Sequence, residues 1–343
     1  MTKPYGKLGD LVTIAMIPRD TFALSGQVLD RLIETTPTGV RIIVMDTGAS
    51  QDARQYMEQR CRENGLTLMR SKDIATPNQT RNKAIELIDT KYVAFVDNDT
   101  LVTEGWLEPL INCAEETGAW VVGPVICEHL PEATFLHGYD GELELRETSD
   151  GARFYHDLHY NAHVRLDDVR HKLERTETRV AELHAQLVAM EAFDKLGPYD
   201  DNIVNMYEYG EFQLRIHECG EKIMLEPGSI VTYVPPGEIP RADREFFEAR
   251  WCEAWTDLTE TSLAAKYGLT PRHPDAKPVH NFVRRQRMLG KNWLRKPRKV
   301  FGNKAVRWLE RKVLVPIDTA INRRKYPASR YGRITPVKFV RVS

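Results

Sequence analysis

The sequence of 343 residues lacks several features that would assign it to a class directly. It has only five cysteines and no CxxC pair, so neither a disulfide framework nor a zinc knuckle is expected. No apolar run approaches the ~20 residues that a membrane-spanning helix needs. The first residues, MTKPYGKLGD, contain no apolar signal-peptide core. These absences predict a cytoplasmic globular protein with reduced thiols.

Charge is distributed unevenly along the chain, although the formal net charge is only −1. Residues 284–343 hold 19 lysines and arginines but only two acids, Glu310 and Asp318. The residues before them hold 29 basic and 47 acidic side chains, so an acidic body precedes a basic tail. A basic segment usually faces something anionic. Three partners are open here: a membrane surface, a nucleic acid, and the acidic body itself.

One part of the tail, residues 303–315 (NKAVRWLERKVLV), has the pattern of a basic amphipathic helix. Val306, Leu309 and Val313 share one face, and basic side chains occupy the others. Such a helix can lie on an anionic membrane, which would make the cytoplasmic protein peripheral to that membrane, or it can lie on nucleic acid. The tail, residues 284–343, is therefore expected to be a helical extension.

The rest of the chain alternates apolar strands with amphipathic helices. Strands are predicted at 11–17, 40–45, 66–70, 92–96, 120–126, 179–190, 222–225 and 230–234, and a hairpin at 142–147 and 152–160. Helices are predicted at 25–35, 53–64, 78–87 with Thr80 as its cap, 106–117, 166–175, 191–196 and 207–219, and one long aromatic helix at 244–267. The early strands are apolar throughout, which indicates a mostly parallel sheet covered on both faces.

Polar residues follow three of these strands: Pro18 and Arg19 the first, Asp46 the second, and Asp97 and Asp99 the fourth. Ligands of such sheets bind beyond the carboxyl ends of the strands. Two carboxylates two residues apart at a turn can share a divalent cation, Mn²⁺ or Mg²⁺, and the diphosphate that it bridges. The sequence therefore predicts a crevice that holds a cation and a phosphorylated ligand.

Four segments carry a resemblance to a known family. They are RIIVMDTGASQD (41–52), NQTRNKAIELIDTKYVAFVDNDTLVTEGWLEPL (78–110), AMEAFDKLGPYDDN (189–202) and YEYGEFQLRIHECGEKI (207–223). In this order they resemble the motifs of family 2 glycosyltransferases, over roughly residues 10–235. The resemblance implies the GT-A fold, a Rossmann-like, mostly parallel sheet flanked by helices. It also implies an inverting nucleotide-sugar transferase.

The resemblance implies a division of the chain and a role for each motif residue. Residues 1–240 would form the GT-A domain, with a nucleotide-sugar half at about 10–126 and an acceptor half at about 127–240, followed by an aromatic helix and linker at 241–283. Pro18 and Arg19 would line the nucleotide pocket, and Asp46 would accept a hydrogen bond from the base. Arg81 would approach the nucleotide or its phosphates. Asp97 would hold the ribose or share the metal, and Asp99 would bind the metal.

Several of these residues also have a purely structural interpretation. Asp46 could cap its own turn, and Arg81 could be an ordinary surface residue of a helix. The family's usual base is an Asp after a Glu, but here the pair reads Glu208-Tyr209. Glu208 or Glu211 is then the catalytic base, with Glu208 favoured because it lies nearer the helix N-terminus. His184 would line the acceptor side or be buried in the core.

The predicted function is an inverting glycosyltransferase that moves a sugar from a nucleoside diphosphate to an acceptor hydroxyl with the help of Mn²⁺ or Mg²⁺. Two alternatives stay open. The tail allows a nucleic-acid-associated protein or a glycosyltransferase that modifies DNA, and Tyr209 allows a non-catalytic, glycosyltransferase-like binding protein.

Overall fold

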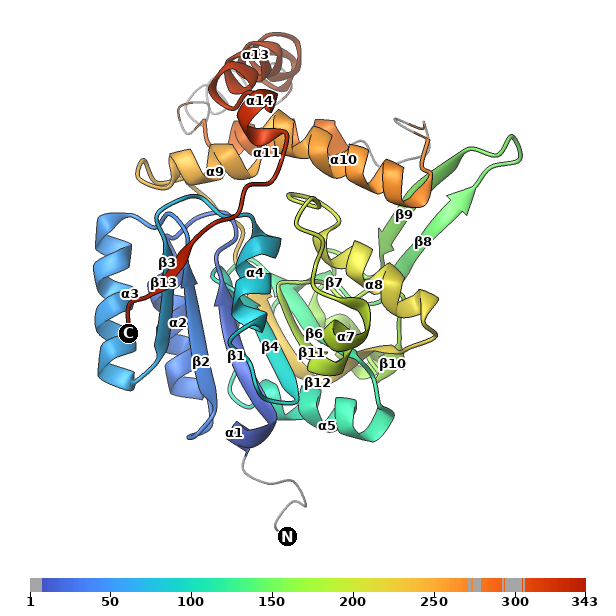
Figure 1. Ribbon diagram of the computed structural model, residues 1–343. Helices are drawn as coiled ribbons and strands as arrows, with labels where there is room; N and C mark the ends of the chain where they lie inside the picture. The colour runs from blue at the N-terminus through green and yellow to red at the C-terminus, as the bar shows by residue number, and fades with distance from the viewer. Residues whose placement is uncertain (1–7, 271–272, 274–278, 292, 294–303, 305) are drawn as a thin grey trace.

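The computed structural model describes residues 8–270, 273, 279–291, 293, 304 and 306–343. Within them, the centre of the protein is an 11-stranded sheet (Figure 1). Its main path runs β10 (Thr176–Glu177), β12 (Ile223–Tyr233), β6 (Val121–Glu128), β11 (Ala185–Ala189), β4 (Tyr92–Asp97), β1 (Val12–Ile17), β2 (Arg41–Asp46), β3 (Thr67–Ser71) and β13 (Phe339–Arg341). Two short strands join it, β5 (Thr100–Val102) on β12 and β7 (Phe135–Gly138) on β6.

The sheet is mostly parallel at its centre, as predicted. β1 pairs in parallel with β2 and β4, and β2 with β3, whereas β11 lies antiparallel between β4 and β6. Every residue of β1 and β4 is buried. A central strand covered on both faces has no solvent side, which explains why these strands read as continuous apolar runs.

The helices of the first 240 residues are α1 (Leu8–Leu11), α2 (Ser25–Thr35), α3 (Gln51–Asn64), α4 (Pro77–Ile85), α5 (Leu107–Thr117), α6 (Leu166–Val169), α7 (Met190–Leu196) and α8 (Glu208–Glu218). In Figure 1, α2 lies behind the sheet and α4 in front of it, so both faces are covered. The predicted helix at 78–87 begins one residue earlier, and its cap is Thr76 rather than Thr80. Thr76 and Gln79 form a reciprocal capping box, with N–H···O distances of 3.1 Å both ways.

Several predicted elements in the middle of the chain differ from those in the structure. Only α6 and the 3₁₀ turn η1 (Arg170–Lys172) are helical within 166–175, and the strand predicted at 179–190 shrinks to β11. The strands predicted at 222–225 and 230–234 are one strand, β12, interrupted by a register shift between Glu226 and Ile230. Apolar patterning does not reveal such a bulge, since the extra residues stay in an extended chain. The predicted hairpin is confirmed as β8 (Gly141–Glu147) and β9 (Arg153–His159), a separate two-stranded sheet that projects from the body.

The aromatic segment forms two helices, α9 (Arg244–Arg250) and α10 (Glu253–Tyr267), not one. The chain turns at Cys252, whose φ of −79° and ψ of 153° are extended. This turn lets Trp251 pack in the cluster of Phe247 while Trp255 packs in another cluster. A straight helix would hold both tryptophans on one face, and the tertiary packing needs them on two.

The basic tail packs against the acidic body and extends its sheet. It contains α11 (Val279–Leu289), the π-helical turn η3 (Glu310–Leu314), α13 (Val315–Lys325) and α14 (Ala328–Tyr331), and β13 pairs antiparallel with β3. The buried Arg287 guanidinium contacts Glu253 of the body at 2.9 Å and Asp318 of the tail at 2.7 Å. Of the three partners considered for the tail, the acidic body is thus one that it does contact.

The predicted amphipathic helix at 303–315 is only partly as expected. Residue 303 lies outside the described residues, and the segment is helical at 304 and from 306 onward. Val306 is buried, whereas Leu309 and Val313 are exposed, so the three residues do not form one buried face. The reason is that the side turned toward the body is a polar one that includes Glu310 and Asp318.

Candidate active site

The carboxylate of Asp97 lies between two arginines at the candidate site. It ends β4, is fully buried, and accepts hydrogen bonds from Arg19 Nη1 at 2.9 Å and from Arg81 Nη2 at 3.1 Å. The next residue, Asn98, accepts a hydrogen bond from the backbone N–H of Arg19 at 2.9 Å and donates one to Ser25 at 2.8 Å. These bonds fix the turn after β1 against the end of β4. Two strands that are far apart in sequence therefore share one rigid edge.

Asp99 lies beside Asp97, but its side chain has no hydrogen-bond partner in the part of the chain that the structure describes. Its side chain is buried, and neither carboxylate oxygen accepts a hydrogen bond from any described residue. Burial, and then the negative charge of Asp97, raise the pKa of Asp99 well above its ordinary value. A buried carboxylate without a donor is costly. It indicates that the site accommodates a cation.

The structure brings His184 to the same place. Its Nδ1 lies 3.6 Å from Asp97 Oδ2, and ligand atoms of Asp97, Asp99 and His184 all lie within 4.8 Å of one another. Burial, and then the positive charge of Arg19, lower the pKa of His184 well below 6.5, so the imidazole is neutral and able to ligate. Two carboxylates and one neutral imidazole fit a divalent cation such as Mn²⁺.

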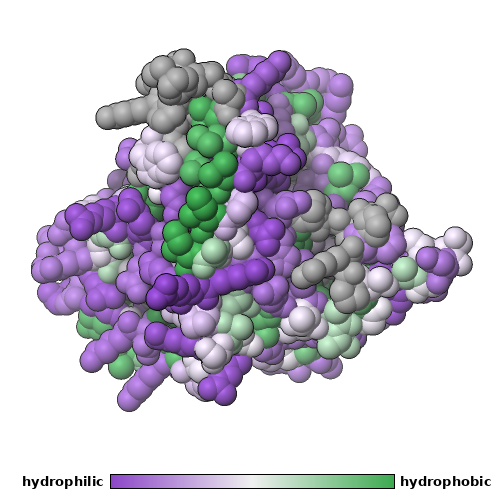
Figure 2. Space-filling view, turned by 90° about the horizontal axis from the view of Figure 1, so that it is seen from above, coloured by the Kyte–Doolittle hydropathy of each residue, from purple (hydrophilic) through white to green (hydrophobic). Residues whose placement is uncertain are grey.

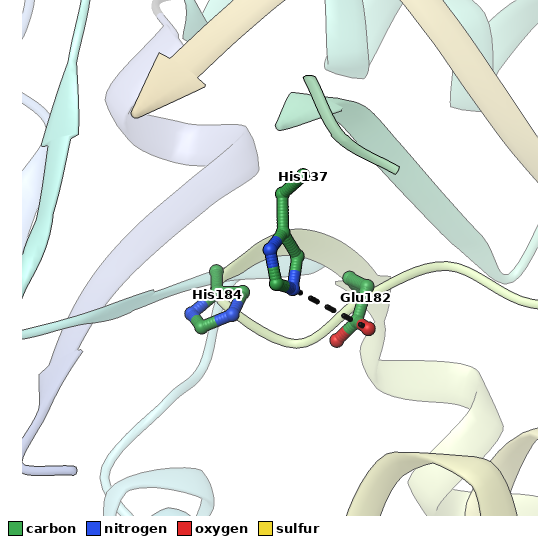
Figure 3. A group of neighbouring side chains, drawn as sticks. All are labelled: His137, Glu182 and His184. Carbon is green, nitrogen blue, oxygen red and sulfur yellow. Dashed lines mark ion pairs between the residues drawn. The ribbon is translucent and has the colours of Figure 1, made fainter. Parts of the chain in front are cut away.

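A second group of polar side chains, His137 and Glu182, lies beside His184 (Figure 3). His137 Nε2 is 3.9 Å from Glu182 Oε1, and His159 Nε2 is 3.2 Å from the same oxygen. His137 is oriented by Glu128, to which its Nδ1 is hydrogen-bonded at 3.1 Å. Burial opposes ionisation of Glu128, but hydrogen bonds with two histidines outweigh it and lower its pKa to about 2. This group shares His184 with the group of Asp97 and Asp99.

Two arginines have buried donors to spare. Arg81 Nε and Nη1 and Arg19 Nε have no hydrogen-bond partner among the described residues. Arg81 is almost completely buried, and that burial lowers its pKa. It is not a surface residue of α4, so that alternative interpretation is wrong. Guanidinium donors without acceptors beside a cation position suit the oxygens of a phosphate group.

Asp46 is already engaged within the protein. Its Oδ1 accepts from the backbone N–H of Ala49 at 3.0 Å, and its Oδ2 accepts from Arg70 Nε at 2.6 Å. It therefore caps its own turn, as its structural interpretation predicted. A role in recognising the base stays a prediction. Pro18 is buried directly after β1, beside Arg19.

The two candidate bases of α8 have different environments. Glu208 accepts a hydrogen bond from Arg250, and its pKa is lowered because Arg250, Arg81 and Arg19 together outweigh the effect of burial. Glu211 instead contacts Lys266 Nζ at 2.6 Å and Tyr267 Oη at 3.0 Å, both in α10. Glu208 thus interacts with the cations of the crevice, whereas Glu211 joins two helices.

Tyr209, in the position after Glu208, lies near the histidine group. Its hydroxyl is 3.5 Å from His159 Nε2, and burial raises its pKa well above 10. It contributes a neutral hydroxyl to the side of the crevice where Glu182 lies. It therefore does not replace the missing carboxylate as a base at neutral pH.

Helix α9 covers the end of the crevice nearest β1 and β2. Phe22 N donates to Asp243 Oδ2 at 2.8 Å, and the rings of Phe22 and Phe246 are 5.0 Å apart. Phe246 also lies over Gly48, where an added Cβ would approach its ring to 3.2 Å. Because Asp99 is only 3% exposed, a ligand as large as a nucleotide reaches it only if covering groups move.

The sequence matches a known family over a range that includes Arg81, Asp97 and Asp99 of this site. Residues 25–165 match glycosyl transferase family 2. This chain carries a family 2 glycosyltransferase domain. The predicted resemblance is thereby confirmed.

Relatives and solved structures agree with this assignment. The polypeptide N-acetylgalactosaminyltransferase 12 of Mus musculus is 31% identical over 175 residues, which is 48% of this chain and 29% of the relative. The Homo sapiens protein of the same name is 30% identical over 170 residues, with the same coverage. A crystal structure of GalNAc-T7 with UDP, GalNAc and Mn²⁺ superposes with a TM-score of 0.52 and 15% identity, covering 94% of this chain and 59% of that chain. The last likeness shows the fold alone, and it confirms the predicted GT-A fold.

The candidate site contains residues that the sequence did not reveal. Asp20 is buried, and its Oδ1 has no hydrogen-bond partner among the described residues. Its position directly after Arg19 at a strand end was a usable signal. His137 and Glu182 had no such signal, because they come from β7 and from the segment before β11 and meet only in the folded protein.

Proposed function

We propose that this protein transfers a sugar from a nucleoside diphosphate donor to an acceptor hydroxyl, with inversion at the anomeric carbon. The observation that carries the proposal is the pair of partnerless, buried Asp99 oxygens next to an Asp97 that two arginines hold. Charges at the site support it. Burial, and then the negative charge of Asp97, raise the pKa of Asp99, and burial raises the pKa of Asp20, although Arg19 acts in the opposite direction on both. A divalent cation would stabilise the ionised forms of these carboxylates.

Asp99 and His184 would hold the cation, with Asp97 beside them. When bound, Mn²⁺ or Mg²⁺ would neutralise the diphosphate as it leaves the sugar. The free donors of Arg19 and Arg81 would bind and orient the phosphate oxygens. Asp97 keeps these two arginines in place, so its main contribution would be positioning.

Glu208 would accept the proton of the acceptor hydroxyl. Its lowered pKa keeps it ionised at neutral pH, and its interactions with Arg81 and Arg19 support a location at the crevice. Inversion requires this carboxylate on the face of the sugar opposite the diphosphate. Glu182 and the histidines around it would line the acceptor side, a role that had been expected for His184.

The choice of donor follows from the relatives. Because the named relatives are N-acetylgalactosaminyltransferases and a structure of similar fold binds UDP, UDP-N-acetylgalactosamine is the first donor to test. The chain spans less than a third of the length of the curated relatives, so the acceptor is not taken over from them.

The test is release of UDP from a panel of UDP-sugars with and without Mn²⁺, followed by ¹H NMR of the first product anomer. Metal-dependent release with an inverted anomer is the expected result. A retained anomer would refute inversion and the role of Glu208. Donor binding without turnover, with any acceptor offered, would identify a glycosyltransferase-like binding protein instead.

The tail supplies the second part of the proposal. No described helix is long and apolar enough to cross a membrane. We propose that the exposed cations of the tail attach this cytoplasmic protein to an anionic partner, a membrane surface or a nucleic acid.

A further inference from the structure

An apolar ridge runs along the outside of the tail helix. Residues 306–325 are helical without interruption, through η3 and α13. Leu309, Val313, Ile317 and Ile321 follow one another at intervals of four, and they are 39%, 37%, 53% and 60% exposed. Figure 2, which views the molecule from the side where α13 lies, shows a green stripe across this face. These four residues are called the ridge.

The ridge is not the side by which the helix packs on the body. That side is formed by Val306, Glu310, Asp318 and Asn322, which are buried. Asn322 Oδ1 accepts from the backbone N–H of Glu253 at 3.0 Å. Leu309, Ile317 and Ile321 each directly precede a buried residue of that side, so the ridge is turned by about 100° from the packing side. The helix would be held equally well if the ridge were polar.

The charges around the ridge are almost all positive. Both acids of the tail are turned inward, and Asp318 is paired with Arg287 at 2.7 Å and Lys291 at 2.8 Å. The exposed basic side chains are Lys304 and, in the helical stretch, Arg307, Arg311, Lys312, Arg323, Arg324 and Lys325. Of these, Arg323 is paired with Glu253 at 3.5 Å and Lys325 with Glu248 at 2.7 Å. The outer surface thus combines apolar side chains with a field of one sign.

We propose that the ridge is a membrane-docking surface, with the helix lying flat on an anionic bilayer. The ridge would enter the boundary between headgroups and acyl chains, and the neighbouring cations would contact headgroup phosphates. This proposal deepens the proposed role of the tail by choosing between its two partners. A nucleic acid would bind the cations but leave the ridge in water. A second copy of the chain would bring like charges together.

Docking in this way has a consequence for the acceptor. The C-terminal helices lie at the carboxyl end of the central strands, the end that holds Asp97 (Figure 1). The candidate active site would therefore face toward the membrane side of the protein. An acceptor anchored in or on the bilayer is the substrate class that this orientation favours.

The test is flotation of the full chain with vesicles of equal phosphatidylglycerol and phosphatidylcholine, and with vesicles of phosphatidylcholine alone. The wild type should float with the anionic vesicles only. The triple variant Val313→Ser, Ile317→Ser, Ile321→Ser should lose at least tenfold in partitioning, because it removes the apolar area that inserts. Neutralising Arg311, Lys312 or Arg324 to Gln should lower partitioning by roughly fivefold for each charge.

Leu158→Ser is the matched control, since Leu158 is 46% exposed on β9, outside the tail. It should float like the wild type. UDP release measured on the same samples keeps the two proposals apart, because the ridge variant should retain it. Unchanged flotation of the ridge variant would overturn the docking surface. If the ridge variant loses self-association instead of flotation, the ridge binds a second copy of the chain. If the variant loses DNA affinity as much as it loses flotation, the ridge binds a nucleic acid. Either result would overturn the membrane-docking surface as well.

Discussion

Replacing Asp97 or Asp99 by asparagine should change the stability of the metal-free protein in opposite directions. Asp97 holds two arginines, of which Arg81 is almost completely buried. Asp97→Asn removes the charge that compensates them, and breaking a buried ion pair in this way costs about 3–5 kcal/mol. Asp99 accepts no hydrogen bond from a described residue, and its pKa is raised, so Asp99→Asn removes a poorly stabilised buried acid and should leave the metal-free protein as stable as before or more so.

For the response to the metal, Asp99 should matter more than Asp97. A cation at 100 times its dissociation constant stabilises the protein by about 2.7 kcal/mol. Asp99→Asn should abolish this gain and reduce turnover on the order of 10²-fold or more. Without metal, the free energies of unfolding of the two variants should therefore differ by about 3 kcal/mol or more, with Asp99→Asn the more stable. Asp99→Asn is thus the variant that should keep its stability and lose the response to the metal.

Thermal unfolding with and without Mn²⁺ and UDP, combined with calorimetry of Mn²⁺ binding, measures both effects. The wild type provides the reference for each. Equal melting temperatures of the two metal-free variants would refute the structural role given to Asp97. A full Mn²⁺ response in Asp99→Asn would refute the cation site.

Three further predictions concern other parts of the chain. Glu208→Gln should lower turnover ~10²–10⁴-fold in single-turnover transfer with donor affinity nearly unchanged, whereas Glu211→Gln should mainly lower the melting temperature; the reverse pattern would move the base. Ion pairs with the carboxylates of Asp257, Glu253 and Glu260, at 3.2, 3.4 and 3.1 Å, raise the pKa of His280 from 6.5 to about 11. The contribution of His280 to stability is therefore complete below pH 6.5 and is lost as the pH rises toward 11. His280→Gln should therefore flatten the fall in melting temperature between pH 7 and 10, and an unchanged slope would contradict the assignment. Arg287→Met should cost about 3 kcal/mol or more in urea unfolding, because it leaves buried carboxylates on both the tail and the body; a change below about 1 kcal/mol would mean that the tail is not part of the folded unit.

The first half of the fold was predictable because its signals are local. The helix at Ser25–Thr35 was predicted with the bounds that it has, and β1, β2 and β4 differ from their predictions by at most one residue at either end. Apolar strands that alternate with amphipathic helices leave few other arrangements. Elements whose form depends on distant partners were predicted less well. The break between α9 and α10 at Cys252 and the register shift in β12 are examples.

The sequence by itself determined the parallel sheet, the family, and the placement of Asp97, Asp99 and Arg19 at strand ends, since strand periodicity and turn residues are properties of short segments. The tertiary structure decided which of these residues already form hydrogen bonds or ion pairs within the protein. It showed that Asp46 is held by Arg70, that His184 lies beside Asp97 and Asp99, and that Glu208 is paired with Arg250 whereas Glu211 is paired with Lys266. It also turned the acids of the tail inward and left an apolar ridge outside. These outcomes depend on contacts between residues far apart in the chain, and such contacts exist only after the chain has folded.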